Sequence, residues 1–141
     1  MKDKTTLEFY EALPDSIPPL EVINHFEELL IIDKRNQLEK IITAQSLLEL
    51  MYRQWYTYQK LPEAVSHKIL DWLIRNWDEN DFELIDTINA IFANLASFMD
   101  MKKGVSFLKK AKENASNASV KNSIEETLSE IQNIKAEDKF Y

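Results

Sequence analysis

The sequence predicts an all-α protein of about six to seven helices arranged as antiparallel pairs. Only one glycine and four prolines occur in 141 residues, which argues against strands joined by tight turns. Apolar residues recur at helical spacing in segments that prolines and short polar runs separate. With 45% hydrophobic residues the chain has enough apolar surface for a core. Since this length is typical of one domain, we expect residues 1–141 to form a single helical domain.

Prolines, polar runs and capping residues delimit the predicted helices. Residues 1–17 are expected to form an N-terminal extension or a short helix that ends before Pro14. The following helices are predicted at about 19–32, 37–58, 62–77, 81–99, 102–115 and 119–135, and the residues at 33–36 are interpreted as a polar joint. The tail at 136–141 is expected to fray.

The helix at about 81–99 is expected to be the centre of the fold and its most buried element. Asn80, followed three residues later by Glu83, has the form of a capping box that begins this helix. Its apolar residues cover an arc much wider than the usual stripe: Leu84, Ile85, Ile88, Ile91, Phe92, Leu95, Phe98 and Met99. Such an arc predicts packing against neighbours on two sides.

A helix, a short joint and a longer helix recur at intervals of about 40 residues, within the period of paired-helix repeats. The apolar positions of the first two units correspond, with Val22, Phe26, Leu29 and Leu30 matching Val65, Ile69, Trp72 and Leu73. On this spacing the chain from Pro19 onward resembles a short HEAT-like array, and among small bacterial proteins it is similar to the all-helical immunity proteins that neutralise polymorphic toxins. The resemblance implies a HEAT-like short stack that binds a protein. An irregular helical bundle shares the same spacing and stays an alternative.

Composition excludes several functional classes. Cysteine is absent, which excludes thiolate catalysis, disulfides and cysteine-based metal sites. With 24 acidic and 17 basic residues the net charge is −7, so we expect a partner with a basic surface and no binding of nucleic acid or membrane. The lysines at 102, 103, 109 and 110 are interpreted as a solvated helix face. Because neither a signal peptide nor a membrane-spanning run is recognised, we expect a cytoplasmic protein.

The first candidate binding surface is an acidic groove. In a stack of helix pairs the second helix of each pair lines the concave surface, so polar residues of three helices should form one shallow groove. The groove residues predicted in this way are Glu39, Glu49, Glu83, Asp86, Asn94 and Glu125. An ordinary solvated helix face is the alternative interpretation.

The second candidate surface is an aromatic patch in the dense run at 52–58. Tyr52, Trp55 and Tyr56 belong to residue types that are enriched at binding hot spots. The alternative is that Tyr52 and Trp55 close the core, while Tyr56 lies across the joint to Pro62.

Each of the two histidines has a carboxylate one turn earlier in the sequence. Glu21 precedes His25, and Glu63, His67 and Asp71 stack on one helical face. Such spacing on paired helices can build a metal site, although it is also common on solvated faces. No named metal motif is present, so we expect neither a metal nor a cofactor.

No nucleophile stands beside a base in a recognisable motif, so no catalytic residue is predicted. The function that we expect is a non-enzymatic protein-binding module, with an immunity protein that covers a basic toxin domain as its narrower form. One alternative is a small helical enzyme or metal-dependent hydrolase that uses His25 and His67 with nearby carboxylates. The other is a structural subunit that forms a homo-oligomer through its aromatic patch.

Overall fold

The computed structural model describes residues 3–141, and this part of the chain is all-α. Its helices are α1 Leu7–Glu11, α2 Pro19–Asn36, α3 Lys40–Thr57, α4 Glu63–Arg75, α5 Phe82–Leu95, α6 Lys102–Asn114 and α7 Ala118–Gln132, followed by the short 3-10 helix η1 Ala136–Asp138. The described residues contain no strand. The predicted fold class is therefore confirmed.

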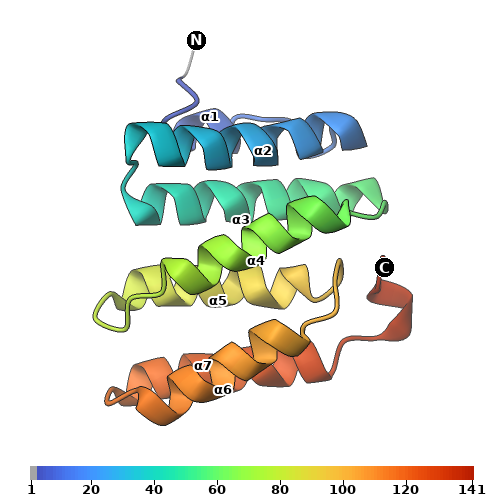
Figure 1. Ribbon diagram of the computed structural model, residues 1–141. Helices are drawn as coiled ribbons and strands as arrows, with labels where there is room; N and C mark the ends of the chain where they lie inside the picture. The colour runs from blue at the N-terminus through green and yellow to red at the C-terminus, as the bar shows by residue number, and fades with distance from the viewer. Residues whose placement is uncertain (1–2) are drawn as a thin grey trace.

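The helices lie in two layers (Figure 1). In one layer α1, α3, α5 and α7 form a row in which each helix packs against the next. The other layer contains α2, α4 and α6, and each of these packs against the helix that follows it in the chain. Neighbouring helices within a pair run in opposite directions, so the fold consists of α1 and three antiparallel pairs.

Asp33 joins three helices of the two layers. One of its carboxylate oxygens accepts a hydrogen bond from Thr43 Oγ1 of α3 at 2.6 Å, and the other accepts from Trp72 Nε1 of α4 at 3.0 Å. These bonds hold Asp33 within α2, which continues to Asn36 and ends at Gln37 in the left-handed conformation. The interpretation of residues 33–36 as a polar joint is therefore wrong, because Lys34 and Arg35 are good helix formers and the tertiary hydrogen bonds hold Asp33 in the helix.

α5 is the central helix, as predicted. Its apolar arc is buried against α3, α4 and α7. The cap, however, is Asp81, whose side chain accepts a hydrogen bond from the Leu84 backbone N–H at 3.2 Å. Asn80 is not the capping residue, and α5 ends at Leu95, earlier than the predicted end.

Long-range contacts hold the end of α1 and the C-terminal tail. The buried Arg53 of α3 donates hydrogen bonds to the carbonyls of Leu13 at 2.8 Å and Glu11 at 3.4 Å, which fixes the end of α1. At the other end the Phe140 backbone N–H donates to the Ser97 carbonyl at 2.6 Å. The Phe140 ring also packs edge-on against Trp55, and the fraying of residues 136–141 stays a prediction.

Because Phe92 lies in the core, we expect truncation of its side chain to lower the free energy of unfolding strongly. This ring is fully buried in α5 and stacks on Phe107 of α6 at 6.2 Å between ring centroids. We expect Phe92→Ala to lower the free energy of unfolding by about 3–5 kcal/mol, the range for deleting a buried aromatic ring. Urea denaturation followed by circular dichroism measures this change. A loss below about 1 kcal/mol would contradict two-sided packing of α5, because surface substitutions have effects of that size.

The hydrogen bonds of Asp33 generate a second prediction. Asp33→Ala leaves the buried donors of Thr43 and Trp72 without an acceptor, so we expect a loss of about 2–3 kcal/mol in the same measurement. The control is Asp15→Ala at an exposed position, which should change stability by less than about 0.5 kcal/mol. Equal losses in the two variants would show that Asp33 does not join the helices.

Candidate partner-binding groove

A shallow pocket of about 350 Å³ opens between α3, α5, α7 and the C-terminal tail. Its lining residues are Tyr52, Trp55, Tyr56, Ala93, Asn94, Ser97, Glu130, Ile134 and Asp138. We call this pocket the aromatic groove. It joins the predicted aromatic patch to the polar side of the central helix, two features that the sequence presented separately.

Three aromatic side chains of α3 form one wall of the aromatic groove. Tyr52 is 43% exposed and Tyr56 is 53% exposed, whereas Trp55 is half-buried and packs edge-on against Phe140 with 5.3 Å between ring centroids. The tail thus packs against the Trp55 ring. Burial raises the pKa of Tyr52, and the charge of Glu49 raises it further, so this phenol stays a protonated hydrogen-bond donor at neutral pH.

Small and polar residues at the end of α5 and directly after it form the opposite wall. Ala93 and Ser97 have short side chains, which allow a ligand to approach the helix backbone closely. Asn94 Nδ2 donates to the Ala90 carbonyl at 2.8 Å, so its amide oxygen stays available as an acceptor. On this side a ligand can therefore approach the backbone and donate a hydrogen bond to the Asn94 amide oxygen. On the aromatic side it can contact the faces of the rings.

The charge of the aromatic groove is negative. Glu130 of α7 and Asp138 of η1 line it, no lysine or arginine does, and neither carboxylate forms an ion pair within the described residues. Sequence reasoning missed both residues. The helical register could have indicated Glu130, because it follows Ser123 and Thr127 on the side of α7 next to α5. Asp138 lies in the tail and had no such signal.

The predicted acidic residues occupy different surroundings. Glu39, Glu83 and Asp86 are exposed, and Asp86 accepts a hydrogen bond from Ser123 Oγ at 3.3 Å. Since α5 is a regular helix, Glu83 and Asp86 lie along its outward side with Asn94. They extend the negative charge toward the beginning of α5.

Two of the predicted acidic residues are neutralised by neighbours. Glu49 lies 3.3 Å from Arg53, and Glu125 lies 3.1 Å from Lys112 of α6. The second pair places Glu125 on the α6 side of α7. The structure therefore brings Asn94, Tyr52, Trp55 and Tyr56 together, and it does not bring Glu125 to them.

The two histidines lie in different environments. His25 packs edge-on against Phe9 at 5.6 Å, and its Nε2 is buried without a hydrogen-bond partner in the described chain. His67 is exposed beside Glu63 at 3.7 Å, and Asp71 pairs with Lys103 at 2.9 Å. Across residues 3–141, no three histidine or carboxylate side chains lie close enough to hold a metal ion.

Comparison of the chain with models of known protein families, with curated proteins and with solved structures found no match. Within the described range, no helix is both long and apolar enough to cross a membrane. The groove geometry is thus the basis for assigning a function.

The environment of His25 predicts a loss of stability in mild acid. Burial lowers the pKa of His25 below its ordinary 6.5, and this effect outweighs the opposing charges of Glu28 and Glu21. The unfolded chain then binds a proton more readily than the folded chain, so the free energy of unfolding should fall as the pH drops below about 6.5.

Urea denaturation between about pH 7 and pH 5 measures this slope, since histidine titrates in that window. His25→Gln should make the slope shallower, because glutamine does not titrate. The matched control, His67→Gln, replaces an exposed histidine and should keep the original slope. An unchanged slope in His25→Gln would contradict the assignment.

Proposed function

We propose that the protein is a non-enzymatic protein-binding module that captures a basic segment of a partner protein in the aromatic groove. One observation carries this proposal: exposed Tyr52 and Tyr56 share a groove with two carboxylates, Glu130 and Asp138, that have no ion-pair partner in the described chain. Aromatic faces and carboxylates are the two groups that bind a lysine or arginine side chain together.

The geometry fits an arginine or lysine that enters between the aromatic and acidic walls. A cation over an aromatic ring gains roughly 0.5–2 kcal/mol, more when it is shielded from water. Hydrogen bonds from the same cation to Glu130 and Asp138 add directional contacts. The short side chains of Ala93 and Ser97 leave room for the partner backbone.

The wider charge distribution favours the same partner. The chain carries a net charge of −7, and Glu83 and Asp86 are exposed along α5. A field of this sign raises the rate of encounter with a basic surface and is screened by salt. It disfavours a homo-oligomer through this groove, because two copies would bring Glu130 and Asp138 against like charges.

The stacked pairs support a HEAT-like architecture as part of this proposal, with α3, α5 and α7 as the second helices that line the binding surface. An immunity protein is the narrower form of the same function. In that form the captured segment belongs to a toxin domain, and the partner should arrest growth when it is expressed without this protein.

Site-specific photo-crosslinking tests the proposed function. A photoreactive phenylalanine analogue at Tyr56, in the groove, should crosslink to one discrete protein in cells of the source organism. The matched control places the analogue at Ile31 of α2, which is 50% exposed and lies outside the groove. Absence of a crosslink from Tyr56, or the same product from Ile31, would contradict partner binding at the groove.

Binding kinetics with the purified partner then separate the two charged regions. Glu83→Lys with Asp86→Lys should slow association several-fold at low salt, and the difference should shrink as ionic strength rises. Glu130→Gln with Asp138→Asn should mainly speed dissociation, because these carboxylates contact the bound segment. Circular dichroism checks that both double variants keep the fold. Unchanged kinetics in both would reject the groove as the binding site.

A further inference from the structure

Residues 3–17, which we call the N-terminal segment, lie beside α2 and α3 at one end of the row of helices (Figure 1). The segment contains α1, a helix of five residues whose N-cap Thr6 forms no capping hydrogen bond through its side chain. The residues that connect α1 to α2 are exposed at positions 12, 14, 15 and 16. A short helix with exposed flanks belongs to the parts of a fold that open most readily.

Few contacts attach the N-terminal segment to the helices beside it. Its buried side chains are Tyr10 and Ile17. Arg53 of α3 donates to two carbonyls of the segment, at 2.8 Å and 3.4 Å, and the ion pair of Lys4 with Glu28 at 2.8 Å is exposed. The Tyr10 hydroxyl donates to the Lys4 carbonyl at 2.9 Å, which holds the segment to itself. The segment is therefore built to move as one unit.

Two aromatic rings of the segment cover His25 of α2. Phe9 and Tyr10 both pack edge-on against the imidazole, with 5.6 Å and 6.5 Å between ring centroids, and they pack on each other at 5.0 Å. The His25 side chain is 12% exposed, and its Nε2 is buried without a hydrogen-bond partner among residues 3–141. The hydration of this nitrogen thus depends on where the segment lies.

The charges closest to His25 favour its protonated form only in part. On α2, Glu21 Oε1 lies 3.9 Å from His25 Nε2, too far for a hydrogen bond, and the charge of Glu28 also attracts a proton. Lys4 of the segment has the opposite effect. Burial outweighs the two carboxylates and lowers the pKa of His25. A proton therefore binds more readily when the ring is hydrated.

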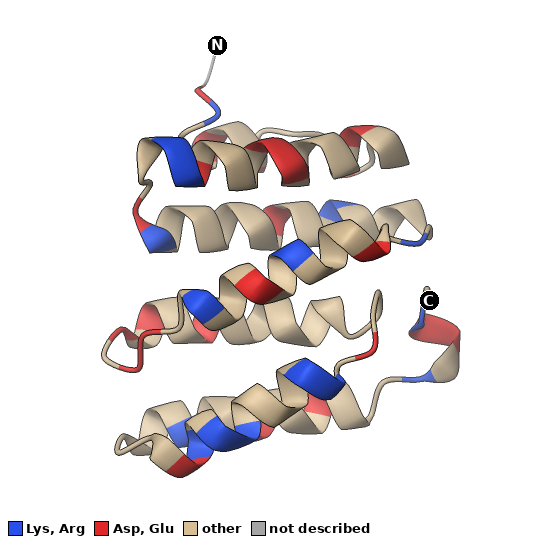
Figure 2. Ribbon diagram, viewed as in Figure 1, with Lys and Arg blue, Asp and Glu red and all other residues tan. Residues whose placement is uncertain are grey.

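The other charged groups near the segment do not compensate a proton on His25. Figure 2 shows acidic residues on α1 and α2, and those of α1, Glu8 and Glu11, are exposed and form no ion pair with His25 in the described chain. On α3, Arg53 lies 3.3 Å from Glu49 and is paired with it.

The phenol beside His25 does not titrate in mild acid. Burial, together with the charges of Glu28 and Asp3, raises the pKa of Tyr10 to about 12. This hydroxyl is therefore neutral on both sides of the histidine titration, and a change between pH 7 and pH 5 does not come from Tyr10.

A proton on His25 is incompatible with the closed arrangement. A protonated imidazole carries an N–H on both nitrogens, so Nε2 becomes a buried donor without an acceptor. Burying such a donor is unfavourable, more so when it is charged. Movement of Phe9 and Tyr10 away from the ring would hydrate it without unfolding the helices of the core.

We propose that the N-terminal segment is an acid-sensitive flap, which opens as one unit when His25 is protonated while α2 to α7 stay folded. Opening withdraws Tyr10 from the core and releases Arg53 from the carbonyls of Glu11 and Leu13. It thereby uncovers the sides of α2 and α3 next to α1. No residue of the segment lines the aromatic groove, so this inference is independent of the proposed function.

Native-state hydrogen exchange, measured by NMR on the full chain, tests the inference. The Ala12 and Leu13 amides report on the segment, because they donate to carbonyls of α1 at 3.0 Å and 3.3 Å. The Phe92 amide reports on the buried centre of α5. After correction for intrinsic exchange, the opening constant of the first two amides should rise at least about threefold from pH 7 to pH 5. It should exceed that of Phe92 at both pH values.

Two substitutions remove the proton-binding group. Neither His25→Gln nor His25→Phe can titrate, and the phenylalanine keeps an aromatic ring beside Phe9. Circular dichroism shows which variant keeps the fold. In a folded variant the opening constant of Ala12 and Leu13 should no longer rise in acid. The matched control, His67→Gln, replaces an exposed histidine and should show the same rise as the unsubstituted chain.

Different results would overturn the two parts of the inference. Equal opening constants for Leu13 and Phe92 would show that the segment opens only with the whole chain. An opening constant of Leu13 that does not change with pH in the unsubstituted chain would remove the role of His25. The same rise in a folded His25 variant would remove it as well.

Discussion

The burial of α5 on two sides is the packing constraint on which the other helices depend. Ile88 and Phe92 are fully buried in its apolar arc, and α3, α4 and α7 all pack against this helix. α6 also approaches α5 closely at Gly104. A β-carbon at this position would lie only 3.4 Å from the Phe92 ring. A helix covered this widely fixes the positions of both layers, which explains why the pairs stack with α5 in the middle of the row.

The same constraint determines what surface remains for binding. Since the apolar arc of α5 is used for packing, the side with Glu83, Asp86, Ala93 and Asn94 is left at the surface. Neighbouring helices then decide its chemistry: α3 contributes aromatic rings and α7 contributes Glu130. The aromatic groove is thus a consequence of how the core is filled, and its recognition groups come from helices that the core positions.

Local periodicity explains how far the sequence predicted the fold and the site. Helix order, the pairing and the central role of α5 follow from apolar spacing, which reports burial directly. The predicted end of α2 was too early. Asp33 stays in the helix because it accepts hydrogen bonds from Thr43 and Trp72, and neither partner is close to it in sequence. Tyr52 and Asn94 line the same groove because particular sides of α3 and α5 face each other. The periodicity of each helix taken alone does not predict which sides will face.

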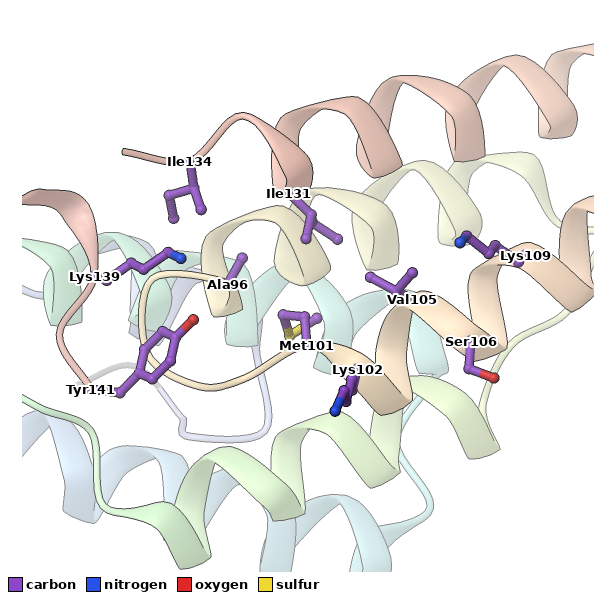
Figure 3. A pocket seen from close by; sticks show the side chains of 10 residues that line it. All are labelled: Ala96, Met101, Lys102, Val105, Ser106, Lys109, Ile131, Ile134, Lys139 and Tyr141. Atoms are coloured by element: carbon purple, nitrogen blue, oxygen red, sulfur yellow. The ribbon is translucent and has the colours of Figure 1, made fainter. Parts of the chain in front are cut away.

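The C-terminal tail lines two pockets, the aromatic groove and a neighbouring pocket between the end of α5, α6 and the end of α7 (Figure 3). Asp138 lines the aromatic groove, whereas Lys139 and Tyr141 line the neighbouring pocket. Between them Phe140 is anchored by its hydrogen bond to the Ser97 carbonyl and by stacking on Phe98 at 5.5 Å between ring centroids. Because one short segment supplies an acid to one pocket and a base to the other, the position of Phe140 sets the rim of both. A displacement of the tail would therefore remove an acidic contact from the groove and a lysine from the neighbouring pocket in the same movement.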